Sequence, residues 1–186
     1  EMVRQVIQPG VGAVGAKLYY PDDTLQHGGV IVGLGGVAGH FDKGLPRDNR
    51  GHFGRAMIVQ NFSAVTAACM LMPRQVFDEV GGFDEIQLAV AFNDVDLCLK
   101  IRQAGYRLVW TPYAELYHHE SVSRGLDSEP EKVDRFATEV RVMQNRWSTK
   151  FEADPFYSPN LTQDRERPVI ADPPRVVKPW AAFYES

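Results

Sequence analysis

The spacing of apolar residues changes several times along the chain, and each change predicts a different element. Residues 2–7 place Met2, Val3, Val6 and Ile7 at helical intervals without a start signal, so we expect a helix that continues from a missing upstream segment. Residues 11–20 form a glycine-spaced apolar strand. A turn at 21–24 and a returning strand at 30–32 follow, which predicts a hairpin.

Small and apolar residues fill positions 62–72, and this run predicts a central buried strand. Pro73 then opens a helix that ends at Gly81 and Gly82. Within the run, Thr66 and the small residues Ala67 and Ala68 leave room beside the backbone. Such room suits either tight packing or a bound ring.

The next helix begins with polar residues and ends at Gly105. Asn93 is a good N-cap, and Asp96 follows at the spacing of a capping box. Asp94 and Asp96 would each stabilise the helix start by roughly 0.3–1 kcal/mol through the helix dipole. A structural role for these carboxylates therefore competes with a chemical one.

Two short strands, 106–110 and 114–118, are expected after this helix, with a break at Thr111 and Pro112. Because side chains alternate along a strand, His118 and His119 should point to opposite sides, and only one can share a cleft with Asp94. Carboxylates and imidazoles exchange protons and bind divalent metals near neutral pH. The sequence has no His-x-x-x-His or Cys-x-x-Cys pair, so most ligands of a metal site would be missing.

The last third starts with a helix over 131–150 that has one apolar face, which indicates docking on the domain. We therefore divide the chain into residues 1–150 and an extended, proline-rich tail at 151–186 that wraps a surface or a neighbouring chain. The glycine-rich segment 33–55 is expected to be a long loop. Its histidines and arginines suit a phosphate or a partner subunit, and a solvated loop is the alternative.

Composition excludes several classes of protein. A chain of 186 residues that is 44% hydrophobic can form one domain with a core. With 20 basic and 24 acidic residues it has no basic stripe, so we expect no nucleic-acid partner. No apolar window is long enough for a transmembrane segment. Cys69 and Cys98 lie in apolar runs and indicate reduced core residues of a cytoplasmic protein.

From residue 11 to about residue 160, the chain resembles the C-terminal half of a family 2 glycosyltransferase domain with the nucleotide-diphospho-sugar transferase (GT-A) fold. The matching segments are 12–18, 26–29, 66–69 with Arg74, 81–85, 93–97, 104–106 and 118–121. The resemblance implies transfer of a sugar, with inversion, from a nucleotide-diphospho-sugar to an acceptor hydroxyl.

The resemblance also implies roles for particular residues. Asp94 corresponds to the general base, and Asn93 stands where many members have Glu. A divalent metal, Mn²⁺ or Mg²⁺, holds the diphosphate in the intact enzyme. A histidine about 25 residues after the base often completes its shell, which favours His119 over His118. Substrate contacts are expected from the following residues: Thr66, Ala67, Arg74, Asn93 and Asp96.

One departure from the family is important. The family's Asp-x-Asp metal motif lies in the N-terminal half, and this chain has none before Asp94; Asp22 and Asp23 lie in a turn. We therefore expect an α/β fold with a mixed sheet flanked by helices, a partial GT-A fold that lacks the nucleotide-binding half. Such a fragment should be inactive and bind no metal alone, and its uncovered surface favours a homodimer.

In the intact protein we expect a nucleotide-sugar donor and a glycan or lipid-linked acceptor, used in surface polysaccharide or glycan synthesis. The expected location is the cytoplasm or the inner face of the membrane. Two alternatives remain open: a non-catalytic module for acceptor binding or assembly, and a metal-dependent hydrolase. The absence of clustered ligands in the sequence argues against the hydrolase.

Overall fold

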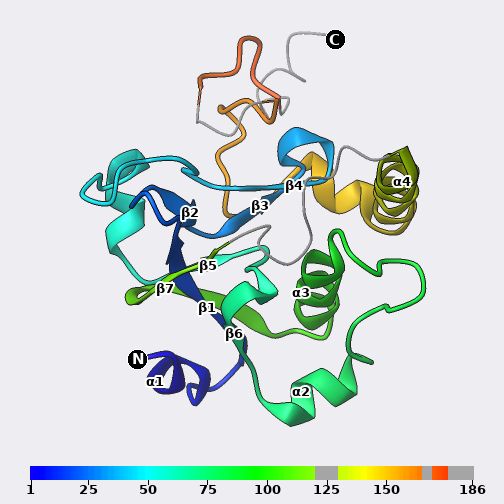
Figure 1. The fold of residues 1–186 in the computed structure, drawn as a ribbon, viewed down its shortest axis with the longest axis horizontal. Helices are drawn as coiled ribbons and strands as arrows, with labels where there is room; N and C mark the ends of the chain where they lie inside the picture. Colours follow the sequence, from blue (N-terminus) through cyan, green and yellow to red (C-terminus); the bar gives the residue numbers. More distant parts are fainter. Residues whose placement is uncertain (120–129, 165–168, 176–186) are drawn as a thin grey trace, which may run out of the picture.

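The structure, a computed structural model, describes residues 1–119, 130–164 and 169–175, and it is a mixed α/β fold (Figure 1). In these residues the main sheet has the strand order β2-β1-β7-β5, and β6 also pairs with β1. Its strands are β1 (Val11–Tyr19), β2 (Leu25–His27), β5 (Gln60–Phe62), β6 (Met70–Leu71) and β7 (Arg107–Tyr117). The sheet is mixed, because β1 and β7 are parallel and the other pairings are antiparallel.

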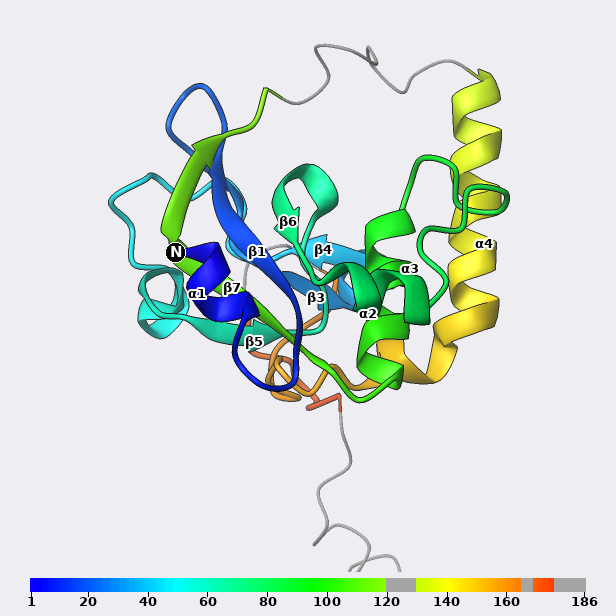
Figure 2. The same ribbon diagram turned by 90° about the horizontal axis from the view of Figure 1, so that it is seen from below.

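The remaining elements pack around this sheet (Figure 2). A second, two-stranded sheet contains β3 (Val30–Val32) and β4 (Ala38–His40). The α-helices are α1 (Met2–Val6), α2 (Arg74–Glu79), α3 (Asn93–Gln103) and α4 (Pro130–Glu152). The 3₁₀ helices are η1 (Leu34–Gly36), η2 (His52–Met57) and η3 (Ala67–Cys69). In both views α3 lies between the sheet and α4.

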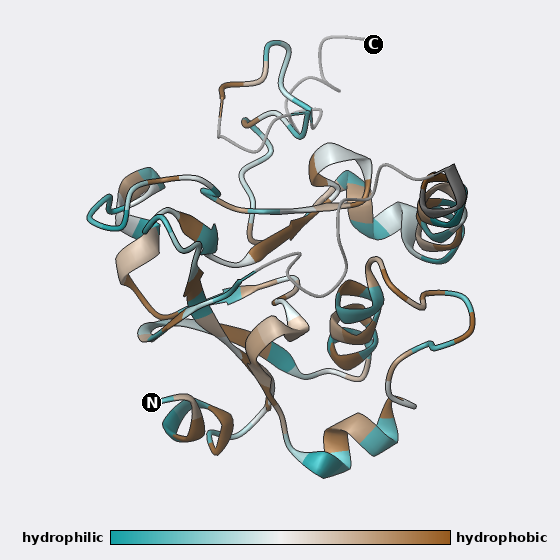
Figure 3. Ribbon diagram, viewed as in Figure 1, coloured by the Kyte–Doolittle hydropathy of each residue, from teal (hydrophilic) through white to brown (hydrophobic). Residues whose placement is uncertain are grey.

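The two faces of the main sheet are covered differently. Val14 and Val109 pack against residues of α1, whereas Ala13 and Leu108 belong to the main core with α3. Alternate residues of a strand face opposite sides, so β1 and β7 are covered on both. All nine residues of β1 are buried, and β3 is apolar throughout (Figure 3). The strand also tolerates no side chain at Gly15, where a Cβ atom would lie 2.6 Å from Val65.

Several predicted elements are confirmed. The first helix, the strand from residue 11, the helix after Pro73 and the helix around Asp94 all form. Gly105 follows α3 with a φ of 94°, a conformation that glycine adopts easily, and it ends the helix as expected. Both cysteines are free, and Cys98 is buried.

The prediction of a central strand over 62–72 is wrong. Only Gln60–Phe62 and Met70–Leu71 are strands, and both are short antiparallel neighbours of β7 and β1. Between them the chain leaves the sheet, because the hydroxyl of Thr66 accepts the N–H of Ala68 and starts η3. The central positions belong to β1 and β7.

The predicted hairpin partner is also wrong. Residues 30–32 pair with β4, and β1 instead pairs with Leu25–His27. The two strands predicted at 106–110 and 114–118 form one strand, β7 (Arg107–Tyr117). The predicted break at Thr111 and Pro112 is instead a shift in register opposite Ala16 and Lys17. Segment 33–55 contains η1, β4 and the first residues of η2, so it is more ordered than a long loop. The end of the tail, 176–186, lies outside the described residues.

Candidate functional site at the start of helix α3

Asp94 lies in the first turn of α3, which runs antiparallel to β7 (Figure 2). The start of α3 is therefore at the carboxyl ends of the parallel strands β1 and β7, the edge where α/β sheets usually bind ligands. One carboxylate oxygen of Asp94, Oδ2, accepts the N–H of Ala67 at 3.0 Å, and Oδ1 accepts the N–H of Val95 at 2.8 Å. Both oxygens are thus oriented by backbone groups.

The segment next to Asp94 consists of small residues and is attached to α3. Ala67 and Ala68 are exposed, whereas Thr66 is buried. The thiol of Cys98 on α3 lies 3.5 Å from both the N and the O atoms of Val65. Burial raises the pKa of this thiol, so it remains a protonated packing group. The two segments therefore keep an open surface beside a fixed carboxylate.

A buried histidine lies behind this surface. His27 Nε2 accepts the N–H of Thr66 at 3.5 Å, and His27 Nδ1 is 2.9 Å from His40 Nδ1. Burial, followed by the charges of His40 and His118, lowers the pKa of His27 well below 6.5. His27 is therefore neutral near pH 7. Sequence reasoning assigned no role to this residue.

The two histidines after β7 have different surroundings. His118 is half-buried. Its ring atom Nδ1 is 2.9 Å from Gln26 Nε2, and its backbone N–H donates to the carbonyl of Tyr19. His119 is exposed. Within the described ranges, no three His, Cys, Asp or Glu side chains are grouped as metal ligands. A metal role for either histidine stays a prediction, and the neighbouring residues 120–121 lie outside the described part.

The other predicted substrate residues are not all brought to Asp94. Asn93 is half-buried and is the first residue of α3; the N-cap position belongs to Phe92, so the predicted cap is one residue late. Arg74 is exposed on α2 and pairs with Asp78 at 2.8 Å. Asp96 is completely buried, so its carboxylate is directed into the protein. The structure thus brings Ala67 to Asp94, with Thr66 next to it in the chain, whereas Asp96 and Arg74 are paired with other residues.

Asp96 belongs to a cluster with α4 that the sequence did not predict. Its Oδ1 accepts hydrogen bonds from Arg146 and from the indole of Trp147, both at 2.8 Å, and Lys100 Nζ lies 3.2 Å from Oδ2. The apolar face of the helix around residues 131–150 predicted the packing of Trp147 but not the partner of its N–H. The one hint in the sequence was that Arg146, a charged residue, directly precedes Trp147, a residue of the apolar face.

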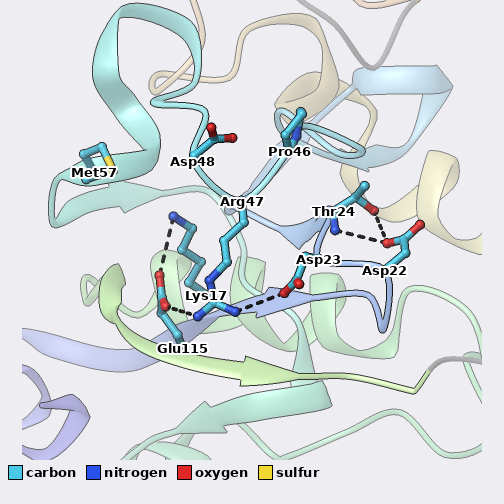
Figure 4. A pocket seen from close by; sticks show the side chains of 9 residues that line it. All are labelled: Lys17, Asp22, Asp23, Thr24, Pro46, Arg47, Asp48, Met57 and Glu115. Atoms are coloured by element: carbon cyan, nitrogen blue, oxygen red, sulfur yellow. Dashed lines mark hydrogen bonds and ion pairs between the residues drawn. The ribbon is translucent and has the colours of Figure 1, made fainter.

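A cavity of about 610 Å³ lies elsewhere, between the ends of β1 and β7 and segment 42–57 (Figure 4). Arg47 lies over it and bonds to Asp23 at 3.1 Å and to Glu115 at 2.6 Å. Lys17 donates to the carbonyl of Ala56, and burial lowers its pKa. Arg47 is one of the basic residues for which a phosphate or a partner subunit was predicted at segment 33–55, and here it is paired with two carboxylates. The role of that segment stays a prediction.

Comparison with known proteins gives several related sequences. The chain is 57% identical over 173 residues to the uncharacterized protein y4gI of Sinorhizobium fredii, covering 93% of this chain and 19% of that protein. It is 41% identical over 163 residues to the O-antigen biosynthesis protein RfbC of Myxococcus xanthus, covering 87% of this chain and 12% of that protein. No family model and no solved structure matches the chain.

A shorter match connects the chain to a named transferase. Over 63 residues it is 40% identical to the N-acetylglucosaminyl-diphospho-decaprenol L-rhamnosyltransferase of Mycobacterium tuberculosis, covering 34% of this chain and 20% of that protein. The chain spans a fifth or less of the length of these relatives. The matches support a glycosyltransferase relationship. Among the described helices, none is long and apolar enough to cross a membrane.

Proposed function

We propose that this chain is the acceptor-side part of an inverting family 2 glycosyltransferase with a partial GT-A fold, in which Asp94 is the general base. The observation that carries the proposal is the Asp94 carboxylate, oriented by the N–H groups of Ala67 and Val95 beside an exposed surface of small residues. The relatives named for O-antigen biosynthesis and rhamnosyl transfer support a glycan product.

The chemistry requires one proton to leave the acceptor. As the acceptor hydroxyl oxygen attacks the anomeric carbon and the nucleoside diphosphate departs, the base takes that hydroxyl proton. Each oxygen of Asp94 accepts one backbone N–H in the structure. A carboxylate oxygen has two lone pairs, so each can still accept a hydrogen bond from the substrate. The backbone contacts then fix the direction of the remaining lone pairs.

The donor side of the reaction needs residues beyond this chain. We propose a nucleotide-sugar donor, held through Mn²⁺ or Mg²⁺ with His119 or His118 as one ligand, and a glycan or lipid-linked acceptor. Further ligands must come from outside the described residues, since these contain no group of three. By this proposal the isolated chain is inactive and associates through uncovered surface. The intact protein works in the cytoplasm or at the inner membrane face.

The proposal is tested by Asp94→Asn in the intact protein that carries this chain. A positioned base contributes about 10²–10⁴-fold, so turnover should fall by that factor while the fold is kept. Asp78→Asn is a matched control, because Asp78 is an exposed carboxylate on α2. Equal turnover of wild type and Asp94→Asn would exclude Asp94 as the base. That result would favour the alternative, in which this chain is a non-catalytic module for acceptor binding or assembly.

The metal assignment has its own test. His119 is exposed, whereas His118 is bonded to Gln26. His119→Ala should therefore raise the Mn²⁺ concentration for half-maximal activity, and His118→Ala should instead lower the unfolding midpoint. Metal titrations of activity and thermal unfolding of both variants check this. The reverse pattern would assign the metal to His118.

A further inference from the structure

The segment that leads into α3, residues 82–92, has no helix or strand and is held by residues of two helices. Lys100 on α3 donates to the carbonyl of Gly82 at 2.7 Å. Glu139 on α4 is 2% exposed and accepts the N–H groups of Val90 and Ala91 at 2.9 and 3.1 Å. Both ends of the segment are therefore attached to helices.

The last residue of this segment is in an unfavourable conformation. Phe92 has a φ of 60°, in the left-handed region that bulky residues rarely adopt. Its carbonyl accepts the N–H of Asp96 at 2.9 Å, and its ring centroid lies 5.5 Å from that of Phe136 on α4. A residue in such a conformation persists only where its surroundings hold it. Here the surroundings are α3 and α4.

One side chain links all of these parts. Arg146 Nη1 donates to Asp96 Oδ1 at 2.8 Å, and Nη2 donates to Asp84 Oδ2 at 2.8 Å and to Gln87 Oε1 at 2.7 Å. The guanidinium is planar, so contacts on its two nitrogens fix the relative placement of their acceptors. Arg146 therefore joins α4, the 84–87 turn and the first turn of α3.

That first turn carries two carboxylates with different partners. Asp96 is bonded to α4, and Asp94 is bonded to Ala67. Because both residues belong to one helical turn, a displacement of Asp96 moves Asp94 relative to Ala67. A misplacement of about 1 Å at a reacting group can cost about a hundredfold in rate.

We propose that Arg146 is a positioning residue for Asp94 and acts through Asp96 and the 84–87 turn. It touches no substrate in this proposal. The catalytic part of the inference rests on the proposed function, whereas the structural link between Arg146 and the Ala67 contact does not.

The structural link is tested first, by hydrogen–deuterium exchange of the intact protein. The N–H of Ala67 is protected by its bond to Asp94. In Arg146→Gln this amide should exchange about tenfold faster, the effect of losing one hydrogen bond. Arg141→Gln is the control, because Arg141 is exposed on the same helix, and it should leave the exchange unchanged. Unchanged exchange at Ala67 in Arg146→Gln would overturn the proposal.

The catalytic part is tested by kinetics. Arg146→Gln should lower kcat about tenfold to a hundredfold and change KM less than about threefold. Arg146→Lys keeps a charge beside Asp96 and should recover part of kcat. Gln87→Ala removes one of the acceptors of Arg146 and should still fold. It should lower kcat by a smaller factor, again with little change in KM.

A double variant separates positioning from general damage. In an Asp94→Asn background, Arg146→Gln should cause no further loss of kcat, because the group that it positions is already absent. Independent, multiplicative losses would refute a route through Asp94. If Asp94→Asn is fully active while Arg146→Gln still exposes the Ala67 amide, the proposed function fails and the structural link stands.

Discussion

Two clusters of charged side chains, one between α3 and α4 and one at the cavity near β1, use the same chemistry in different surroundings. In the first, Asp96 is 0% exposed and is bonded to Arg146 and Trp147. In the second, Arg47 is 43% exposed and pairs with Asp23 and Glu115, which are 58% and 37% exposed. The distances are similar, so burial is what distinguishes the clusters.

This difference determines what each cluster can do. At Asp96, which is completely buried, water cannot replace a lost partner, so a single geometry of the cluster is strongly favoured. At the exposed cluster water and salt compete with every contact. The buried cluster is therefore suited to hold the start of α3 and with it Asp94. The exposed cluster is suited to attach segment 42–57 to the strands without fixing it tightly.

The largest effect on stability is expected from Asp96→Asn. The change leaves Arg146 and Lys100 beside a neutral amide in a buried place, and breaking a buried pair costs roughly 3 kcal/mol when one partner is partly exposed. Arg146 is 30% exposed, which places the expected loss at this lower end. Urea unfolding measures the free energy of unfolding.

Its control is Asp78→Asn on α2. Asp78 is 55% exposed and pairs with Arg74, which is 85% exposed. This variant should unfold like the wild type. Equal losses of unfolding free energy in the two variants would show that the burial of Asp96 does not determine the cost of losing its charge.

A middle-sized effect on the free energy of unfolding is expected when the pH is lowered, because His27 binds a proton only in the unfolded state. The folded state keeps His27 neutral because burial lowers its pKa, whereas the unfolded imidazole titrates near 6.5. Below that pH the unfolded state binds a proton that the folded state does not. The free energy of unfolding should therefore fall as the pH is lowered, by up to about 1.4 kcal/mol per pH unit, and be unaffected by His27 at higher pH.

The check compares wild type with His27→Gln at several pH values. His40 and His118 face His27, and the buried carboxyl of Asp154, whose pKa is raised by burial, acts in the opposite direction. Only the difference in pH dependence between wild type and His27→Gln gives the contribution of His27. Identical pH slopes would mean that His27 does not titrate in the unfolding reaction.

The smallest effect is expected from Arg47→Gln at the exposed cluster. The unfolding midpoint should drop by less than about 3 °C, and this difference should shrink further in about 1 M salt. Thermal unfolding at low and high salt measures both. A large drop of the unfolding midpoint that does not depend on salt would show that the Arg47 contacts are as important for stability as those of Asp96. This result would contradict the comparison.

Prediction from sequence was reliable where a pattern was local. The helices at residue 2, after Pro73 and around Asp94 depend on apolar spacing and on residues such as Pro73 and Gly105, which act within one turn. Strand pairing was less predictable. The run 62–72 has the composition of a central strand, yet β1, which is interrupted by glycines, takes a central position. Gly15 of β1 lies so close to Val65 that no side chain would fit there, and a contact of this kind cannot be read from composition.

The site shows the same division. That Asp94 and Asp96 would share the first turn of a helix follows from the sequence alone, since their spacing and the helix boundaries are local. That Asp94 would meet Ala67 while Asp96 met Arg146, 50 residues away in the chain, was decided by tertiary packing. Partners so distant in sequence leave no periodic signal; they are selected by which surfaces of α3 become buried, and the cost of an unpaired buried charge then selects the contacts.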